Sequence, residues 1–251
     1  SKTVHQTRFT YIWSTNYGYS REGHSVIVPE QRDSMHNKER LVSTTKLRYT
    51  LQMLATSTQG ALIVISGPSG VGKTTIVHRV QKELDAIFSV SATTRPKSDR
   101  ETEGIDYAFV TPERFEELVQ KDAFLEHAEV FHCHRYGTLR TPVEEVLSTG
   151  KLILLDIDVQ GGIQVHKNME QSLRFFILPP SEEELLRRLT ARGREDADSI
   201  QRRFSEAKQE ISLASESGAY EFFITNDNLD LAVAEIVAII RNCQDVARSA
   251  T

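Results

Sequence analysis

The chain has 251 residues, 39% apolar and 26% charged, which is typical of a globular protein with a substantial core. Residues 1–58 hold eight Lys/Arg and four Asp/Glu, which leaves −9 for the remainder of a chain whose net charge is −5. This balance argues against nucleic acid as a partner of the main domain. Two cysteines, Cys133 and Cys243, are too few for a disulfide framework, and no signal peptide or long apolar run is present. We therefore expect a cytoplasmic protein without a membrane partner.

Residues 1–58 show little helical or alternating periodicity, apart from Leu41, Leu47, Leu51 and Leu54, which have the spacing of a short helix face. We expect this segment to be a poorly structured N-terminal extension. The first 20 residues carry no acidic group, a composition also weakly typical of an organelle transit peptide, so that alternative stays open.

A glycine-rich segment, Gly67-Pro68-Ser69-Gly70-Val71-Gly72-Lys73-Thr74, has the spacing G-x-x-x-x-G-K-T of a phosphate-binding loop. It follows the apolar run 61–65 and precedes the helical pattern 75–84, which is the context that the motif requires. Its backbone N–H groups and the helix N-terminus would hold a polyphosphate. We expect Lys73 to reach the outer phosphates and Thr74 to bind a Mg²⁺ ion. The alternative is a glycine-rich turn with a chance lysine.

From Gly60 onward, strand and helix patterns alternate, which predicts an α/β fold with a parallel core sheet covered on both faces. The expected strands are 61–65, 88–91, 107–110, 124–130, 151–158, 174–178 and 221–225. We place 124–130 at a sheet edge and 221–225 inside the main sheet. The expected helices are 75–84, one beginning at Thr111-Pro112, 141–147, one capped by Ser181, and 229–248.

Two acids follow the apolar strand 151–158. Asp156 and Asp158 are two residues apart, so they would share one side of the strand, close to the phosphate loop, because ligands of parallel sheets bind at the strands' carboxyl ends. One of them would orient the magnesium shell, and the other would accept hydrogen bonds from a substrate. The alternative for either acid is a cap on the next turn.

An arginine-rich stretch runs from Arg187 to Arg203. Arg188 and Arg192 have the i, i+4 spacing of one helix face and precede a glycine. Guanidinium groups stabilise the charge that spreads over a phosphoryl group in transfer, and a mobile arginine-bearing lid would expel water. Some of these arginines would instead form a solvated helix face.

Further segments together resemble guanylate kinase, in order from about Gly60 to Val246. They are the phosphate loop with its strand, Ser89–Arg95, Gly104–Tyr107, Phe124–Glu129, Tyr136–Thr138 and Ile153–Gly161. The resemblance implies a P-loop NTPase three-layer α/β/α fold, with ATP and Mg²⁺ as cofactors and GMP as the phosphoryl acceptor. It further implies a core of about 59–92, 150–185 and 205–248, a small mixed α/β GMP-binding subdomain of about 93–140, and a helical lid of about 186–204.

The resemblance also implies roles by position. Its GMP site comprises Ser91, Arg95, Glu101, Tyr107, Glu126, Tyr136, Thr138 and Asp158. Guanine presents an N1–H and an amino group as donors, which Glu126 or Asp158 would accept, so adenine would leave these carboxylates unpaired. Lys73, Arg188, Arg192 and Arg203 match catalytic positions, Asn226 matches a position near the donor adenine, and Thr74 and Asp156 would serve the metal. No general base is expected, because the attacking phosphate oxygen is already ionised.

The chain departs from the family pattern twice. Ser98 stands where the family has a second phosphate-binding arginine, so Arg100 or Lys97 would have to replace it. The stretch Phe131–Tyr136 is one residue longer than usual; its cluster of His132, Cys133 and His134, with His127, suggests a metal site, but neighbouring residues seldom converge on one ion.

Two other functions stay open at this point. One is a guanylate-kinase-like binding module, which typically has a degraded phosphate loop. The other is a kinase for a different nucleotide or small metabolite, which Glu126 and Asp158 disfavour. The sequence leaves the oligomeric state, monomer or homodimer, undecided.

Overall fold

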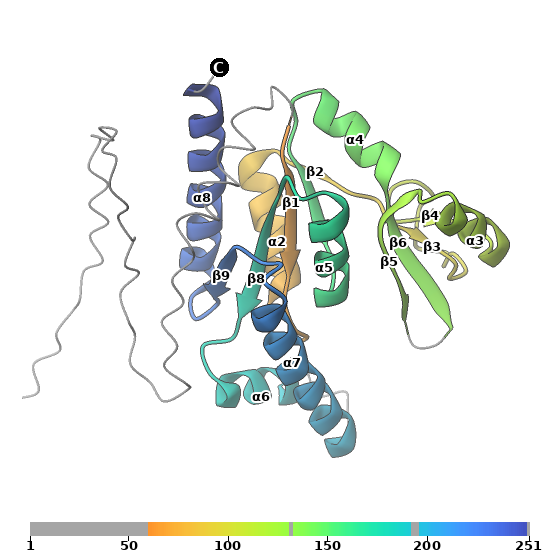
Figure 1. Ribbon diagram of the computed structural model, residues 1–251. Helices are drawn as coiled ribbons and strands as arrows, with labels where there is room; N and C mark the ends of the chain where they lie inside the picture. The colour runs from red at the N-terminus through yellow and green to blue at the C-terminus, as the bar shows by residue number, and fades with distance from the viewer. Residues whose placement is uncertain (1–59, 131–132, 192–195, 250–251) are drawn as a thin grey trace, which may run out of the picture. The chain divides into compact units, whose positions relative to one another are not determined.

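The computed structural model describes residues 60–130, 133–191 and 196–249, so the expectations for residues 1–58 lie outside the described part (Figure 1). The strands are β1 Leu62–Ser66, β2 Ile87–Phe88, β3 Ala92–Thr93, β4 Ala108–Phe109, β5 Phe124–Val130, β6 His134–Leu139, β7 Ile153–Asp156, β8 Ser172–Leu178 and β9 Phe222–Thr225. The helices are α2 Lys73–Leu84, α3 Pro112–Gln120, α4 Arg140–Ser148, α5 Val159–Asn168, α6 Glu182–Thr190, α7 Ala197–Ser217 and α8 Leu229–Ser249.

The main sheet is parallel throughout, with strand order β2-β7-β1-β8-β9. Every residue of β1 is buried, because this central strand has neighbours on both sides and helices on both faces. The expectation that 221–225 forms an inner strand is wrong, since β9 lies at the sheet edge. Its apolar character has another cause: the Phe222 ring stacks on Phe175, with 4.8 Å between ring centroids.

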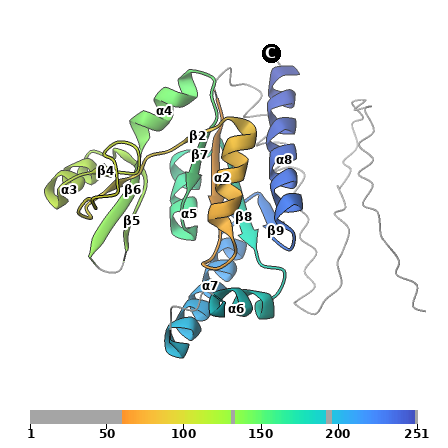
Figure 2. The ribbon, with the colours of Figure 1, turned by 180° about the vertical axis from the view of Figure 1, so that it is seen from behind.

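Helices cover both faces of this sheet, as the alternation of strand and helix patterns predicts (Figures 1 and 2). Successive β1 residues point to opposite faces, so Ile63 and Ile65 pack with α2 and α8, whereas Leu62 and Val64 pack with α4 and α5. Within the described residues, no helix combines the length and apolar character needed to cross a membrane.

A second, mixed sheet has strand order β4-β3-β6-β5, with β5 at its edge as expected. Phe115 of α3 stacks on Phe124 of β5, at 4.5 Å between ring centroids, and so packs this helix against the sheet. The segment 88–91 is not one strand: β2 ends at Phe88 in the main sheet and β3 begins at Ala92 in the second sheet. Residues 89–91 therefore connect the two sheets.

Helix α5 was not expected from the sequence, because it contains Gly161 and Gly162, and glycine disfavours helices. The structure gives a packing reason for the second glycine. A Cβ on Gly162 would lie 2.0 Å from the Tyr220 hydroxyl oxygen, so Tyr220 leaves no room for a side chain. The hydroxyl of Tyr220 donates to the Val159 carbonyl and ties the segment before β9 to the start of α5.

A buried ion pair joins β8 to the segment before β9. Arg174 is 1% exposed, and its guanidinium donates to Glu221, to the Ala219 carbonyl at 2.6 Å and to the Ser172 hydroxyl. The Arg174 backbone N–H also donates to Glu221, at 3.1 Å. Polar groups from both segments are thus paired inside an apolar core, where an unpaired charge would be strongly unfavourable.

Candidate active site

The phosphate loop joins β1 to α2 and depends on glycine at two positions. Gly70 and Gly72 have φ angles of 87° and 93°, which residues with a Cβ rarely adopt. Gly72 is the N-cap of α2, and no side chain caps this end and no acid lies in the first turn. The first amides of the helix therefore need an external partner, and an anion suits them.

Lys73 links the loop to the carboxyl end of β7. Its Nζ lies 2.6 Å from Asp156 Oδ1 and donates to the Ile157 carbonyl at 3.1 Å. Asp156 reaches this position because it pairs in register with Ile65 of β1. The sequence-based expectation that the end of this strand lies beside the phosphate loop is confirmed.

The expectation that Asp156 and Asp158 share one strand is wrong, because β7 ends at Asp156. Asp158 is instead the N-cap of α5, and its Oδ1 accepts a hydrogen bond from the Gly161 N–H at 2.7 Å. The capping alternative therefore holds for this residue. The cap uses one carboxylate oxygen and leaves the second for another donor.

Glu126 lies near Asp158, although it comes from β5 of the other sheet. It is 6% exposed and accepts a hydrogen bond from the Thr138 hydroxyl of β6 at 2.7 Å. Burial, with a smaller contribution from Asp158, raises the pKa of Glu126 to about 7. Gly161 packs against Glu126, since a Cβ there would lie 3.0 Å from Oε2. The structure thus brings together the two carboxylates that the sequence assigns to one substrate.

The second sheet also carries a cluster around the guanidinium of Arg95. Arg95 donates to the Tyr136 hydroxyl at 3.3 Å and to both carboxylate oxygens of Glu101, and its Cζ lies 5.4 Å from the centre of the Tyr107 ring. Arg95, and then Ser98, lower the pKa of Glu101 to about 2. The residues expected to bind an acceptor phosphate therefore form one connected cluster. Ser91 lies just before β3, where its carbonyl accepts from the Ala108 N–H.

Two of the expected catalytic arginines contact the phosphate loop. Arg188 donates to the Val71 carbonyl at 3.3 Å and to the Asn226 carbonyl at 3.0 Å. Arg203 of α7 donates to the Ser69 hydroxyl. Arg192 lies outside the described residues; α6 ends at Thr190.

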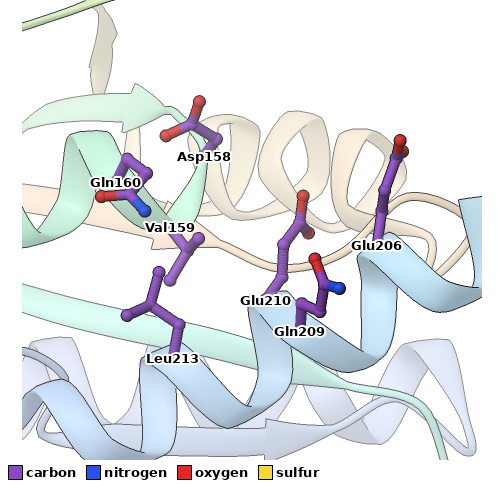
Figure 3. Close-up of a pocket in the computed structure, with 7 residues that line it drawn as sticks. All are labelled: Asp158, Val159, Gln160, Glu206, Gln209, Glu210 and Leu213. Atoms are coloured by element: carbon purple, nitrogen blue, oxygen red, sulfur yellow. The ribbon is translucent and has the colours of Figure 1, made fainter.

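A pocket of about 250 Å³ opens between α5 and α7 beside Asp158 (Figure 3). Its lining combines polar and apolar residues and comprises Asp158, Val159, Gln160, Glu206, Gln209, Glu210 and Leu213. Figure 3 shows the carboxylates of Glu206 and Glu210 rising from α7 on the side of the pocket where Asp158 lies. Burial first, and then Asp158, raise the pKa of Glu210 to about 7, while Lys73 lowers it.

Comparison with known proteins places this chain in a family. The family model described as guanylate kinase matches residues 59–243. This chain belongs to the guanylate kinase family. A guanylate kinase of Anaeromyxobacter dehalogenans is 49% identical over 185 residues, covering 73% of this chain and 80% of the relative. One of Alkalilimnicola ehrlichii is 46% identical, covering 72% of this chain and 87% of the relative. The crystal structure of guanylate kinase from Anaplasma phagocytophilum has a TM-score of 0.56 and 34% identity, covering 73% of this chain and 86% of that chain.

The P-loop NTPase fold that the sequence resemblance implied is confirmed by this family membership. Ser98 stands where the family has a second phosphate-binding arginine, and the structure shows what this serine contacts. Ser98 donates its N–H and its hydroxyl to Glu101, at 2.9 and 2.8 Å, and so supports the carboxylate that holds Arg95. Arg100 and Lys97 are exposed. Of the histidines considered for a metal site, His127 of β5 packs against the Phe124 ring, and His132 lies outside the described residues.

Sequence reasoning missed two acids near this guanylate kinase site. Glu184 accepts from Arg188 at 2.7 Å, and its i, i+4 spacing from Arg188 was a signal that could have indicated the pair. Glu210 was missed because α7 was not expected as a long helix. Its signal was the seven-residue spacing from Arg203, which places both residues on one face of a helix.

Proposed function

We propose that this chain transfers the γ-phosphoryl group of ATP to GMP, and to dGMP, giving ADP and GDP. The observation that carries the proposal is the short segment from Asp156 to Asp158, which joins two half-sites. Asp156 contacts Lys73 of the phosphate loop, and Asp158 lies near the buried carboxylate of Glu126. A donor phosphate and an acceptor nucleotide held by these groups would lie close together.

The donor half-site would consist of the phosphate loop, Gly67 to Thr74, with Asn226 beside it. Lys73 would leave part of its contact with Asp156 to reach the outer phosphates. The oxygens of Thr74, exposed at the start of α2, and of Asp156 are ligands that suit Mg²⁺. When bound, that ion would neutralise charge on the donor phosphates.

The acceptor half-site would identify guanine by its donors. Glu126 and Asp158 would accept hydrogen bonds from the guanine N1–H and amino group, while Ser91 would donate to O6 and Thr138 would hold Glu126 in place. Arg95, Tyr107 and Tyr136 would bind the GMP phosphate, with Glu101 orienting Arg95. Adenine would leave two carboxylates without donors, which a polar site rejects strongly.

Transfer would need no general base, because the GMP phosphate oxygen that attacks is ionised near neutral pH. Arg188, Arg192 and Arg203 would stabilise the charge on the moving phosphoryl group, an effect worth up to about 10³–10⁵-fold where an arginine acts as a finger. We further propose a cytoplasmic setting and a monomer or homodimer, with no nucleic acid partner.

A coupled assay of ADP release tests the proposal, with GMP, dGMP, AMP, UMP and IMP compared as acceptors. We expect GMP to be the best acceptor, dGMP to react, and AMP and UMP to fail. IMP lacks the amino group, so it should react more poorly than GMP. No GMP-dependent ADP release would reject the function, and equal use of AMP would reject the proposed reading of the base.

A further inference from the structure

Asn226 lies directly after β9, and its side chain contacts the phosphate loop. It is 6% exposed, and its Nδ2 donates to the Val71 carbonyl at 2.7 Å. Its backbone N–H donates to the Leu178 carbonyl at 2.8 Å, which fixes the residue against the end of β8. Gly72 also lies beside this side chain, since a Cβ added there would lie only 2.7 Å from the same Nδ2. Asn226 thus packs against two consecutive loop residues.

Arg188 completes the pairing of the same carbonyl. Val71 is fully buried, and its carbonyl accepts from Asn226 and from Arg188, so both lone pairs of the oxygen are used. Arg188 is held in turn by the Asn226 carbonyl, through a second guanidinium nitrogen. A buried carbonyl that lost its donors would be unfavourable, so these contacts fix its direction.

The direction of this carbonyl sets the direction of an amide. The Val71 carbonyl and the Gly72 N–H belong to one planar trans peptide unit, so the two bonds point in opposite directions. Among the described residues, no hydrogen-bond acceptor of the Gly72 N–H is found. Because Asn226 and Arg188 hold the Val71 carbonyl, the Gly72 N–H points away from these two residues. Gly72 is the N-cap of α2, so this N–H lies at the N-terminus of the helix.

We infer that Asn226 is a positioning residue for phosphoryl transfer, acting through Val71 and Gly72 instead of contacting the donor base. The inference rests on the proposed function, in which the loop amides bind the donor phosphates. It predicts that the contribution of Asn226 to donor binding is independent of the base. A direct contact with adenine would instead be lost with any ligand that has no base.

The test compares two ligands on the full-length chain by calorimetry, ATP and inorganic tripolyphosphate, each with Mg²⁺. Asn226→Asp keeps the size of the side chain but removes the donor to Val71. We expect it to weaken the binding of both ligands by a similar factor, about tenfold, as for loss of one buried hydrogen bond. Asn226→Ala, which adds no charge beside Arg188, should do the same.

Asn228→Asp is the matched control, because Asn228 accepts from the Asp230 and Leu231 N–H groups and aspartate can do so equally. It should leave both affinities unchanged. GMP affinity reports whether each variant is folded. Weakening of ATP alone would show a contact with the base, and no weakening of either ligand would show that the loop does not depend on Asn226; either result overturns the inference. Both measurements omit the acceptor, so they remain informative if GMP is not phosphorylated.

Discussion

The phosphate loop and the second sheet hold their polar groups in different ways. At the loop, a buried main-chain carbonyl, that of Val71, is held by two side-chain donors. On the second sheet, partly exposed side chains hold one another, as Arg95, Glu101 and Tyr136 do. The buried hydrogen bonds at Val71 are shielded from solvent, whereas the partly exposed ion pair on the second sheet is more sensitive to pH, salt and a ligand.

The largest predicted effect, which should distinguish the phosphate loop from the second sheet, follows from replacing Lys73. Lys73→Ala should lower turnover at least about 10³-fold, because the donor phosphates lose the cation that Asp156 now holds. GMP binding should change little, since we propose that its contacts come mainly from the second sheet. Lys82→Ala, a lysine in the last turn of the same helix, is the control and should retain turnover. Normal turnover of the Lys73 variant would contradict the role.

The stability of the main sheet can be tested at Arg174. Arg174→Met leaves Glu221 buried and without its cation, so the free energy of unfolding should fall by about 3–5 kcal/mol. Arg114→Met breaks an exposed pair with Glu117 on α3 and should have a small fraction of that effect. Urea unfolding measures both. Equal losses would mean that burial does not distinguish the two pairs.

Specificity for the base should depend on the second sheet. Glu126→Gln removes the charge proposed to accept the guanine donors, so the KM for GMP should rise about 10–100-fold while the KM for ATP stays unchanged. Glu129→Gln, an exposed position on the same strand, is the matched control. A similar rise in both variants, or none in either, would argue against a guanine contact at Glu126.

The smallest predicted effect is a dependence on pH. The pKa of Glu126 is raised to about 7, so the group is increasingly protonated below that pH and can no longer accept both guanine donors. The KM for GMP should therefore rise several-fold between pH 7.5 and 6. Glu126→Gln should reduce this dependence. A pH-independent KM in the unaltered chain would contradict this prediction.

The same pKa shift has a consequence for stability. The folded-state pKa of Glu126 lies above that of the unfolded chain, so the folded state binds the proton more tightly. Its contribution to stability is present below the unfolded pKa, near 4.5, and is lost as pH rises through about 7. This change is opposite in direction to that of Glu101, whose pKa is lowered.

The sequence predicted the parts of the molecule that depend on local pattern. The glycine spacing of the loop, the buried strand 61–65 and the cap at Ser181 follow from residue type and order, and the structure contains all three. The edge position of β9 could not be predicted, because Phe222 is apolar for a reason other than an inner position: it is partly buried and stacks on the Phe175 ring of the neighbouring strand. Helix α5 was missed because its glycines reflect contact with Tyr220, which lies far away in the sequence.

The candidate site shows the same limit. The resemblance indicated Glu126, Asp158 and Arg95, and the spacing left a cap open for Asp158, but local pattern did not show which of the two acids, Asp156 or Asp158, would be the cap. The partners of Arg188 depend on how β9 approaches the loop, which no local pattern encodes.

Helix α7 contacts both half-sites from one face. Arg203 reaches Ser69 of the phosphate loop, and Glu210, two turns further along, lines the pocket beside Asp158. A rigid rotation or slide of this helix changes both separations at once. A ligand that shifted this helix at one half-site would therefore alter its contacts at the other as well.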